Sequence, residues 1–360
     1  MDRFGDKICC NPTVKLKKQE SYPVIDIDKI TPGYKAVRSV ASIEYTGQGG
    51  AKFQDHDVLF ARITPCLENG KMAIADTEGQ NGIGSTELFV FRGIDGVSDT
   101  DYVYYLLCMK HIRQLAANSM TGASGRQRAD LDFIKRIQWD FPDIEMQKKI
   151  ASVLSAYDNL IEVNNKRIKV LEQIAENLYK EWFVRFRFPG HETSGFENGI
   201  PKGWNVCRFS SIANVLSGGT PSTDHDEYYG GNIPFYTPKD SSDDYFVFDT
   251  ISKLTEEGLQ HCNSQLYPKN TIMITARGTV GNLNLLAKPM AMNQSCYALT
   301  SNTIPSQYFL FFLIKREILK LRKMASGGVF DTIIVSTFDH IKVTIPDKSL
   351  ICLLYTSDAA

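Results

Sequence analysis

Hydrophobic residues recur at alternating steps of three and four along the middle of the chain. The series runs between residues 143 and 184, and one of its positions carries the polar residue Asn164. Such a repeat is typical of a helix that packs one face against a partner helix, as in a coiled coil. The members of the series are Ile150, Leu154, Tyr157, Ile161, Asn164, Ile168, Leu171, Ala175, Leu178 and Trp182.

A helix of roughly 40 residues would form a rod of about 60 Å at about 1.5 Å per residue. Pro142 stands where this helix is expected to begin, and Pro189-Gly190 follows the aromatic-rich stretch that ends it. An asparagine in an apolar seam typically fixes the register of the paired helices. We therefore predict a spacer helix over residues 143–185. The alternative is a long core helix inside one large domain.

The flanking regions alternate short β-rich runs with amphipathic helices. "DVLFAR" and "NTIMITAR" have the composition of buried strands. "DYVYYLLCMKHIRQLAANSM" and "PSQYFLFFLIKREILKLRKM" have a helical period. Ser98 or Asp101 is a candidate cap for the first helix, and Pro305-Ser306 suits the start of the second. Each flank is therefore predicted to be an α+β domain.

The two flanks are copies of one another. At a shift of 204 (308 − 104) the stretch Tyr104–Asp143 lies on Tyr308–Asp347 without a gap. "FARIT" (60–64) matches "TARGT" (275–279) at a shift of 215 (275 − 60). A repeat this long indicates duplicated domains and not a solenoid. We predict a domain over residues 1–142, the spacer helix, a linker over residues 186–202, and a second domain over residues 203–347.

The repeat also predicts that a second spacer helix begins after Asp347. The chain instead reads "KSLICLLYTSDAA", without Lys/Glu-rich heptads. We expect that this second helix is missing, that residues 348–360 are a truncated end, and that residues 351–360 are a foreign tail.

Composition excludes few classes of protein. The net charge is −1, with local basic clusters and separate acidic loops such as "STDHDEYY". Basic clusters suit a phosphate-binding face, and they are equally common as solvated helix faces. The longest apolar run, "YFLFFLI", is too short to span a membrane, and no export leader opens the sequence. The eight cysteines form no CxxC pair, which fits a reducing cytoplasm.

Basic and amide side chains at loops are candidates for binding phosphates or base edges. An arginine at the end of a strand can bind guanine O6 and N7 or a phosphate, although a structural salt bridge is the alternative. Asn and Gln amides suit adenine. The candidates are Lys29, Arg62, Thr64, Arg126, Gln127 and Arg128 in the first copy, and Lys239, Arg277, Thr279, Asn293 and Gln294 in the second. Val329, Phe330 and Asp331 stand near the place of the Arg126–Arg128 group in the second copy, so that role is doubtful there.

The sequence lacks the common motifs of catalytic proteins. The sequence contains no GxxxxGK[ST], HExxH or GxSxG pattern, and no Asn/Asp-Pro-Pro-aromatic tetrad. Asp243 and Asp244 stand together in a polar loop without an accompanying His or Lys motif. We predict a non-catalytic chain without a metal site.

The order of mixed domain, long helix and second mixed domain resembles the specificity (S) subunits of type I restriction–modification enzymes. The resemblance covers essentially residues 1–350. Its carriers include "FARITPCLENGKMAI", "GIGSTELFVFR", "TGASGRQR", "ENLYKEWFVRFRFPGHE", "IPFYTPKD", "IMITARGTVG" and "MNQSCYAL". It implies two target-recognition domains, each reading one half of a split DNA sequence. It also implies that the helix sets their separation and docks partner subunits.

The resemblance also implies the partners. These are double-stranded DNA, methyltransferase (M) subunits, two in number, and restriction (R) subunits reached through the complex. S-adenosylmethionine, ATP and Mg would belong to those subunits, so no cofactor is expected on this chain. Two other functions stay open at this point: a fragment of a fused restriction–methyltransferase that has lost its catalytic part, and a helical scaffold that does not bind DNA.

Overall fold

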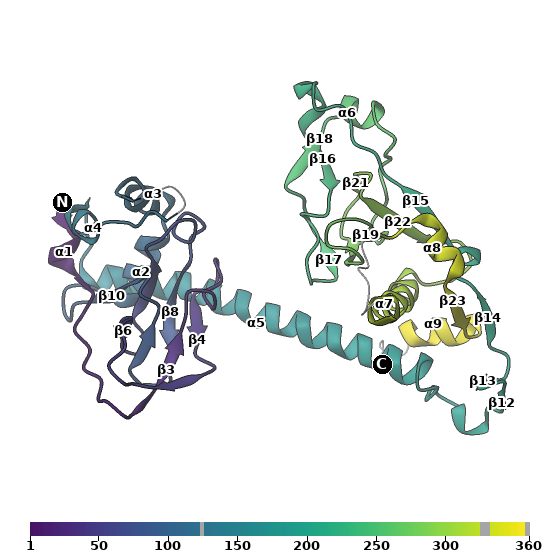
Figure 1. Cartoon of the computed structure of the whole chain (residues 1–360), viewed down its shortest axis with the longest axis horizontal. Coiled ribbons are helices and arrows are strands. Elements are labelled where there is room, and N and C mark those ends of the chain that lie inside the picture. The colour runs from purple at the N-terminus through teal and green to yellow at the C-terminus, as the bar shows by residue number, and fades with distance from the viewer. Residues whose placement is uncertain (123–125, 325–331, 357–360) are drawn as a thin grey trace. The chain divides into compact units, whose positions relative to one another are not determined.

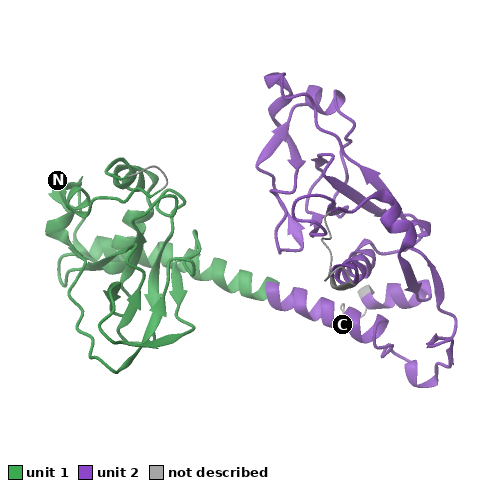
Figure 2. Ribbon diagram, in the orientation of Figure 1, with its two compact units in different colours: residues 1–168 green, residues 169–360 purple. Residues whose placement is uncertain are grey.

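The structure is a computed structural model that describes residues 1–122, 126–324 and 332–356. The chain divides into two compact units, residues 1–168 and residues 169–360 (Figure 2). The division falls inside the long helix α5 (Ile144–Phe183), so each unit contains part of that helix (Figure 1). The predicted spacer helix is therefore present. The domain boundaries inferred from the sequence stay a prediction.

The first unit is built on a five-stranded sheet in the order β2-β10-β7-β8-β4. Neighbours are antiparallel except for β4 and β8, which are parallel. The runs "VLFA" and "MAIAD" supply β7 and β8, and both are almost entirely buried because apolar side chains cover both faces of the sheet. The bounds are β2 Ile8–Cys10, β4 Ala36–Arg38, β7 Val58–Ala61, β8 Met72–Asp76 and β10 Leu88–Gly93.

Smaller elements complete the first unit. A four-stranded sheet has the order β5-β3-β9-β6, and β1 pairs with β11. The strands are β1 Asp2–Arg3, β3 Ser21–Ile25, β5 Ser42–Glu44, β6 Ala51–Phe53, β9 Gly82–Gly84 and β11 Gln138–Trp139. The helices are α1 Phe4–Lys7, α2 Thr100–Cys108, α3 Lys110–Asn118 and α4 Leu131–Arg136.

The predicted helix over residues 101–120 is interrupted. Met109 has an extended backbone conformation, which separates α2 from α3. Neither Ser98 nor Asp101 caps α2. Asp99 does so, by accepting a hydrogen bond from Tyr102 N at 2.9 Å. Asp101 instead forms an ion pair with Lys35 at 2.5 Å.

The second unit repeats the same scaffold. Its five-stranded sheet has the order β15-β22-β19-β20-β17, again with one parallel pair at the edge, β17 with β20. A three-stranded sheet has the order β18-β16-β21, and β14 pairs with β23 as β1 pairs with β11. The strands are β14 Asn205–Arg208, β15 Ala213–Ser217, β16 Tyr229–Tyr236, β17 Phe246–Val247, β18 Ser252–Leu254, β19 Ile272–Thr275, β20 Leu283–Leu286, β21 Ala291–Met292, β22 Cys296–Ser301 and β23 Lys342–Ile345.

The helix α7 (Gln307–Met324) packs against strands β20 and β22 of this second sheet. Ser306 caps α7, as predicted, by accepting a hydrogen bond from Phe309 N at 3.2 Å. The helices are α6 Glu256–Gln260, α7 Gln307–Met324, α8 Val335–His340 and α9 Lys348–Thr356, with 3₁₀ turns at His191–Thr193, Phe209–Ser211 and Asp226–Tyr228. The linker contains the small pair β12 Phe196–Glu197 and β13 Ile200–Pro201. The shared topology of the two units confirms the duplicated α+β fold.

The backbone hydrogen bonds show which residues of the two copies are equivalent at the end of β7 and β19. Arg62 N donates to Glu87 O, and Arg62 O accepts from Ala129 N. In the second unit Ala276 makes the equivalent pair of bonds, with Ser295 O and Ile333 N. The sequence match of Arg62 with Arg277 is therefore wrong by one residue, which reverses the side to which a strand residue points.

The helix α9 begins directly after Pro346-Asp347, as α5 begins after Pro142-Asp143. Its nine residues stand where the first copy has the forty residues of α5. The last four residues of the expected foreign tail, 357–360, lie outside the described residues.

Polar bonds hold the start of α5 in the first unit. The Gln147 side chain is fully buried: its Nε2 donates to Val97 O and Pro142 O, and its Oε1 accepts from Asp99 N. About two and three turns further on, Ser155 and Asp158 each bind the Tyr105 hydroxyl. A buried amide that satisfies all these partners fixes the helix more specifically than apolar contact alone.

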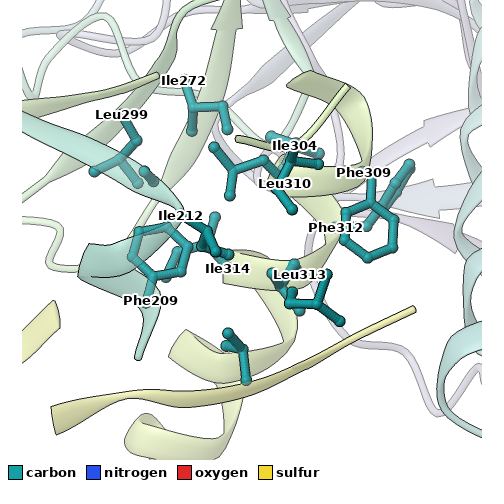
Figure 3. Close-up of a cluster of buried hydrophobic side chains, with 14 of the residues drawn as sticks. Phe209, Ile212, Ile272, Leu299, Ile304, Phe309, Leu310, Phe312, Leu313 and Ile314 are labelled. Atoms are coloured by element: carbon teal, nitrogen blue, oxygen red, sulfur yellow. The ribbon is translucent and has the colours of Figure 1, made fainter. Parts of the chain in front are cut away.

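Aromatic packing holds the end of α5 in the second unit. Tyr179, Trp182 and Phe183 are buried in the largest hydrophobic core of that unit. Phe183 meets Phe309 of α7 edge-to-face at 4.9 Å. Figure 3 shows side chains of the same core, from α7 and from the sheet.

Glu176 adds a charged network to this packing. Its carboxylate accepts from Lys315 Nζ at 2.7 Å and from the Tyr245 hydroxyl at 2.9 Å, and it pairs with Lys180 at 2.6 Å. Burial raises the pKa of Glu176, but these hydrogen bonds outweigh burial and lower the pKa from 4.5 to about 2. The charged form of Glu176 therefore stabilises the folded state.

Replacing Glu176→Gln is expected to lower the free energy of unfolding by about 1–3 kcal/mol at pH 7, because hydrogen bonds to a charged group are lost. The group's pKa is lower in the folded state, so its contribution is complete above pH 4.5 and declines as the pH falls toward about 2. The difference between the two proteins should therefore shrink at pH 3. Urea unfolding followed by tryptophan fluorescence measures it. Glu162→Gln, which removes an exposed pair with Lys166, is the control and should change stability by less than about 0.5 kcal/mol.

Candidate DNA interface and spacer helix

Three segments of the first unit meet where β7 ends. Arg62 N bonds to Glu87 O at 3.0 Å, and Ala129 N bonds to Arg62 O at 2.8 Å. Thr64 N bonds to Gln127 O at 3.0 Å. The structure thus brings together four predicted DNA contacts, Arg62, Thr64, Gln127 and Arg128, from segments more than 60 residues apart. We call Arg62, Thr64, Glu87 and Arg126–Arg128 the first-unit cluster.

Arg62 is held by stacking. Its guanidinium carbon lies 4.5 Å from the centre of the Phe89 ring. Its Nε is buried and forms no hydrogen bond within the described part of the chain. A surface hollow of about 480 Å³ adjoins it, lined in part by Asn11, Thr13, Lys52 and Thr86. The alternative interpretation of Arg62 as a structural salt bridge therefore finds no counterpart among the described ion pairs.

Arg128 is paired with a carboxylate. Its Nε and Nη2 bind the two oxygens of Glu87 at 2.8 and 2.5 Å, in the fork geometry that arginine also uses for phosphate and guanine. The hydrogen bonds from Arg128 lower the pKa of Glu87, and the charge of Arg62 acts in the same direction. Sequence reasoning missed Glu87, because a single acid inside "STELFVFR" carries no motif.

The remaining first-copy candidates take different positions. Arg126 is exposed and is the first described residue after 123–125, which the structure does not describe. The Thr64 hydroxyl is engaged with Gln127 O at 3.3 Å. Lys29 is exposed in a turn that follows β3, and it pairs with Asp28 at 3.1 Å. Lys71, from the loop after Arg62, donates to Ile27 O in that turn at 2.9 Å.

The second unit assembles its own group of candidates. Arg277 and Thr279 are exposed in the loop after β19, and Lys239 is exposed in a turn closed by Asp240 N and Thr237 O. The two loops touch: a Cβ on Gly278 would lie 3.9 Å from Pro238 Cβ. These loops differ in residue type from the first-unit cluster although they occupy related places in the scaffold.

Asn293 and Gln294 form the third side of this group. Asn293 N bonds to Tyr236 O at 3.0 Å, next to the Lys239 turn. The Asn293 Oδ1 accepts from Ser295 N at 3.1 Å, and the Gln294 Oε1 accepts from the Thr220 hydroxyl. An adenine would therefore share these oxygens with bonds inside the protein. Residues 329–331, near the place of the Arg126–Arg128 group, lie outside the described residues.

The predicted seam of α5 is buried only at its ends. Trp182 is buried and Leu178 and Ile150 are partly buried. Between them the apolar side chains are exposed to solvent: Leu154 38%, Tyr157 64%, Ile161 54%, Ile168 49% and Leu171 54%. Asn164 is exposed as well. This exposed row suits a helix that binds another protein or another helix.

Neither a metal-binding cluster nor a membrane-spanning helix occurs among the described residues. There, no three His, Cys, Asp or Glu side chains come together in a way that would bind a metal ion. Ser242 O and Asp244 O accept from the buried Asn284 side chain, which fixes the backbone of the acidic loop. No described helix combines the length and the apolar character needed to cross a bilayer.

Comparison with known proteins identifies the family of the chain. The profile described as "Type I restriction modification DNA specificity domain" matches residues 8–173 and again residues 201–349. The chain belongs to that family. The two matches fall on the two copies found in the sequence.

Relatives extend over most of the chain. It is 24% identical over 370 residues to the HindI type I specificity subunit of Haemophilus influenzae, which covers 85% of this chain and 80% of that protein. It is 25% identical over 367 residues to the MjaVIII specificity subunit of Methanocaldococcus jannaschii, covering 96% and 81%. The crystal structure of the type I S subunit from M. genitalium has a TM-score of 0.55 at 15% identity, over 99% of this chain and 88% of that one. The fold of this specificity protein is thus shared with an S subunit.

The contrast between the ends and the middle of α5 generates a test. Trp182→Ala should lower the free energy of unfolding by about 3–5 kcal/mol, because it empties a core position. Ile161→Gln should leave it within about 0.5 kcal/mol, because an exposed side chain is replaced by a good helix former. Chemical unfolding followed by circular dichroism compares them. A loss above 2 kcal/mol for Ile161→Gln would show that the middle of the seam is packed within one chain.

Proposed function

We propose that this specificity protein recognises a DNA target made of two short half-sites, one read by each unit. The observation that carries the proposal is the duplicated scaffold. Each unit gathers cationic and amide side chains at the same end of corresponding strands, but the side chains themselves differ. Identical scaffolds with different contact residues are what two unrelated half-sites require.

The helix α5 is proposed as the spacer. It is one element that enters the core of the first unit at Gln147 and the core of the second at Trp182. A helix has a fixed rise per residue, whereas a flexible linker samples a broad range of lengths. Half-sites on one face of B-DNA recur about every 34 Å. A stiff element of this kind can therefore select the number of base pairs between them.

The exposed row on α5 is proposed as the docking surface for methyltransferase subunits, two in number, through which restriction subunits join the complex. Exposed Leu, Ile and Tyr side chains on a long helix bind a partner helix by apolar packing. S-adenosylmethionine, ATP and Mg would then be bound by those subunits, and the chemistry would be theirs. The protein would act in the cytoplasm, where bacterial DNA lies.

Two other functions were open from the sequence. A fragment of a fused restriction–methyltransferase and a scaffold without DNA binding are not favoured, because the family profile and relatives over most of the chain are specificity proteins. The specificity role is non-catalytic.

Changing the length of α5 tests the spacer. Removing one heptad from residues 154–171 shortens the helix by about 10 Å, or about three base pairs at ~3.4 Å each. In a cell that carries the partner genes, methylome sequencing should show the same two half-sites with a correspondingly shorter gap. An unchanged gap would contradict the spacer role.

Substituting single cations tests the contact residues. Arg62→Gln and Arg277→Gln should each weaken binding to duplex DNA. They should also lower the slope of log K against log[salt] by about 0.9 if the lost contact is to a phosphate. Arg38→Gln, an exposed arginine that pairs with Asp76 and Glu78, is the matched control. Fluorescence anisotropy over a salt series measures the effect, and equal losses in all three variants would show that only net charge matters.

A further inference from the structure

The single carboxylate of the first-unit cluster lies among its cations. Glu87 binds the Arg128 fork with both oxygens and lies close enough to Arg62 for the two charges to interact. A DNA-binding surface normally excludes acids, because a carboxylate repels phosphate. The presence of Glu87 among these cations therefore needs an explanation, either structural or functional.

The second unit shows that the fold does not need this pair. Ser295 takes the place of Glu87, because its carbonyl accepts from Ala276 N at 2.8 Å as the Glu87 carbonyl accepts from Arg62 N. At the 204-residue shift Thr332 takes the place of Arg128. The segments are nevertheless joined by the same backbone bonds, including Ile333 N to Ala276 O at 3.1 Å. Among the described residues, the positions equivalent to Arg62, Glu87 and Arg128 carry Ala276, Ser295 and Thr332, so the scaffold forms with no charged side chain at these three positions.

The exposure of the pair also argues against a stabilising role. The Arg128 side chain is 46% exposed and that of Glu87 21%. An ion pair at such a site contributes little to stability, because water and salt screen it. Its geometry is nevertheless bidentate, and only a partner with two adjacent acceptors can replace a carboxylate in the fork without loss.

We propose that Glu87 is a specificity-determining residue that keeps Arg128 paired in the free protein and yields it only to a DNA group offering two adjacent acceptor oxygens or nitrogens. Two groups have that chemistry: a phosphodiester and the O6/N7 edge of guanine. Loose, non-specific encounters do not displace the carboxylate, whereas a correctly seated duplex does. This inference rests on the proposed DNA-binding function and adds a restraint on it.

Removing the carboxylate of Glu87 should therefore strengthen binding to DNA. In Glu87→Gln the Arg128 fork is free in the unbound protein and can contact any duplex. Binding to a non-target duplex should become at least threefold tighter near 100 mM salt. If the freed fork binds a phosphate, the salt slope should also rise by about 0.9, the value for one added phosphate contact. Discrimination between target and non-target DNA should fall in parallel.

A double-variant cycle on the full chain tests whether Glu87 acts through Arg128 or only through its own negative charge. Arg128→Gln should abolish the gain in affinity in the Glu87→Gln variant, with a fall in salt slope of about 0.9 if the contact is to a phosphate, and it should leave the slope unchanged when Glu87 is present. Glu78→Gln is the matched control, because Glu78 is also an acid of the first unit that pairs with an arginine, Arg38. It should not change the slope.

Two duplexes of equal length identify the group that replaces Glu87. One is a mixed-sequence duplex and the other is poly(dA)·poly(dT), which has no guanine. A gain for Glu87→Gln on both supports exchange with phosphate, and a gain on the mixed duplex alone supports exchange with guanine. No gain on either, or an equal gain for Glu78→Gln, overturns the restraint. If the unaltered chain binds neither duplex at any salt concentration, the proposed DNA-binding function itself fails.

Discussion

The embedding of the two ends of α5 is the constraint on which the rest of the structure depends. At one end a buried amide, Gln147, is fully hydrogen-bonded in the first unit. At the other, Tyr179, Trp182 and Phe183 are part of the main core of the second, with the charged Glu176 network beside them. Neither end can leave its core without exposing a buried polar group or a large apolar surface. The exposed middle of the helix is then free to carry another function.

Duplication explains how two different contact surfaces arise on one protein. Two backbone bonds recur in both units: one joins the strand end to the turn before the next strand of the sheet, and the other joins it to the segment after the helices. The side chains displayed there differ, since Arg62, Glu87 and Arg128 correspond to Ala276, Ser295 and Thr332. Main-chain bonds thus fix where contacts are made, while side chains decide what is contacted. A surface built this way can change its target without a change of fold.

Much of the architecture could be predicted from the sequence because its signals are periodic. The heptad pattern gave α5, and the shift of 204 gave two copies with one topology. The structural counterpart of Arg62 could not be predicted. The sequence aligns Arg62 with Arg277 because both are arginines, and only the backbone hydrogen bonds show that Ala276, one residue earlier, is the equivalent position. Likewise the break at Met109 and the cap at Asp99 depend on local backbone geometry. Of the candidate contacts, the sequence indicated the cations but not Glu87, since its role follows from Arg128, 41 residues away.

The central claim is that one chain reads two separated half-sites at a set distance. Selection of duplexes bound by the full chain from a randomised library, followed by sequencing, tests it most directly. The account predicts two short specified tracts of different sequence with a gap of constant length and no base preference between them. A single uninterrupted motif, or two tracts whose separation varies freely, would contradict it.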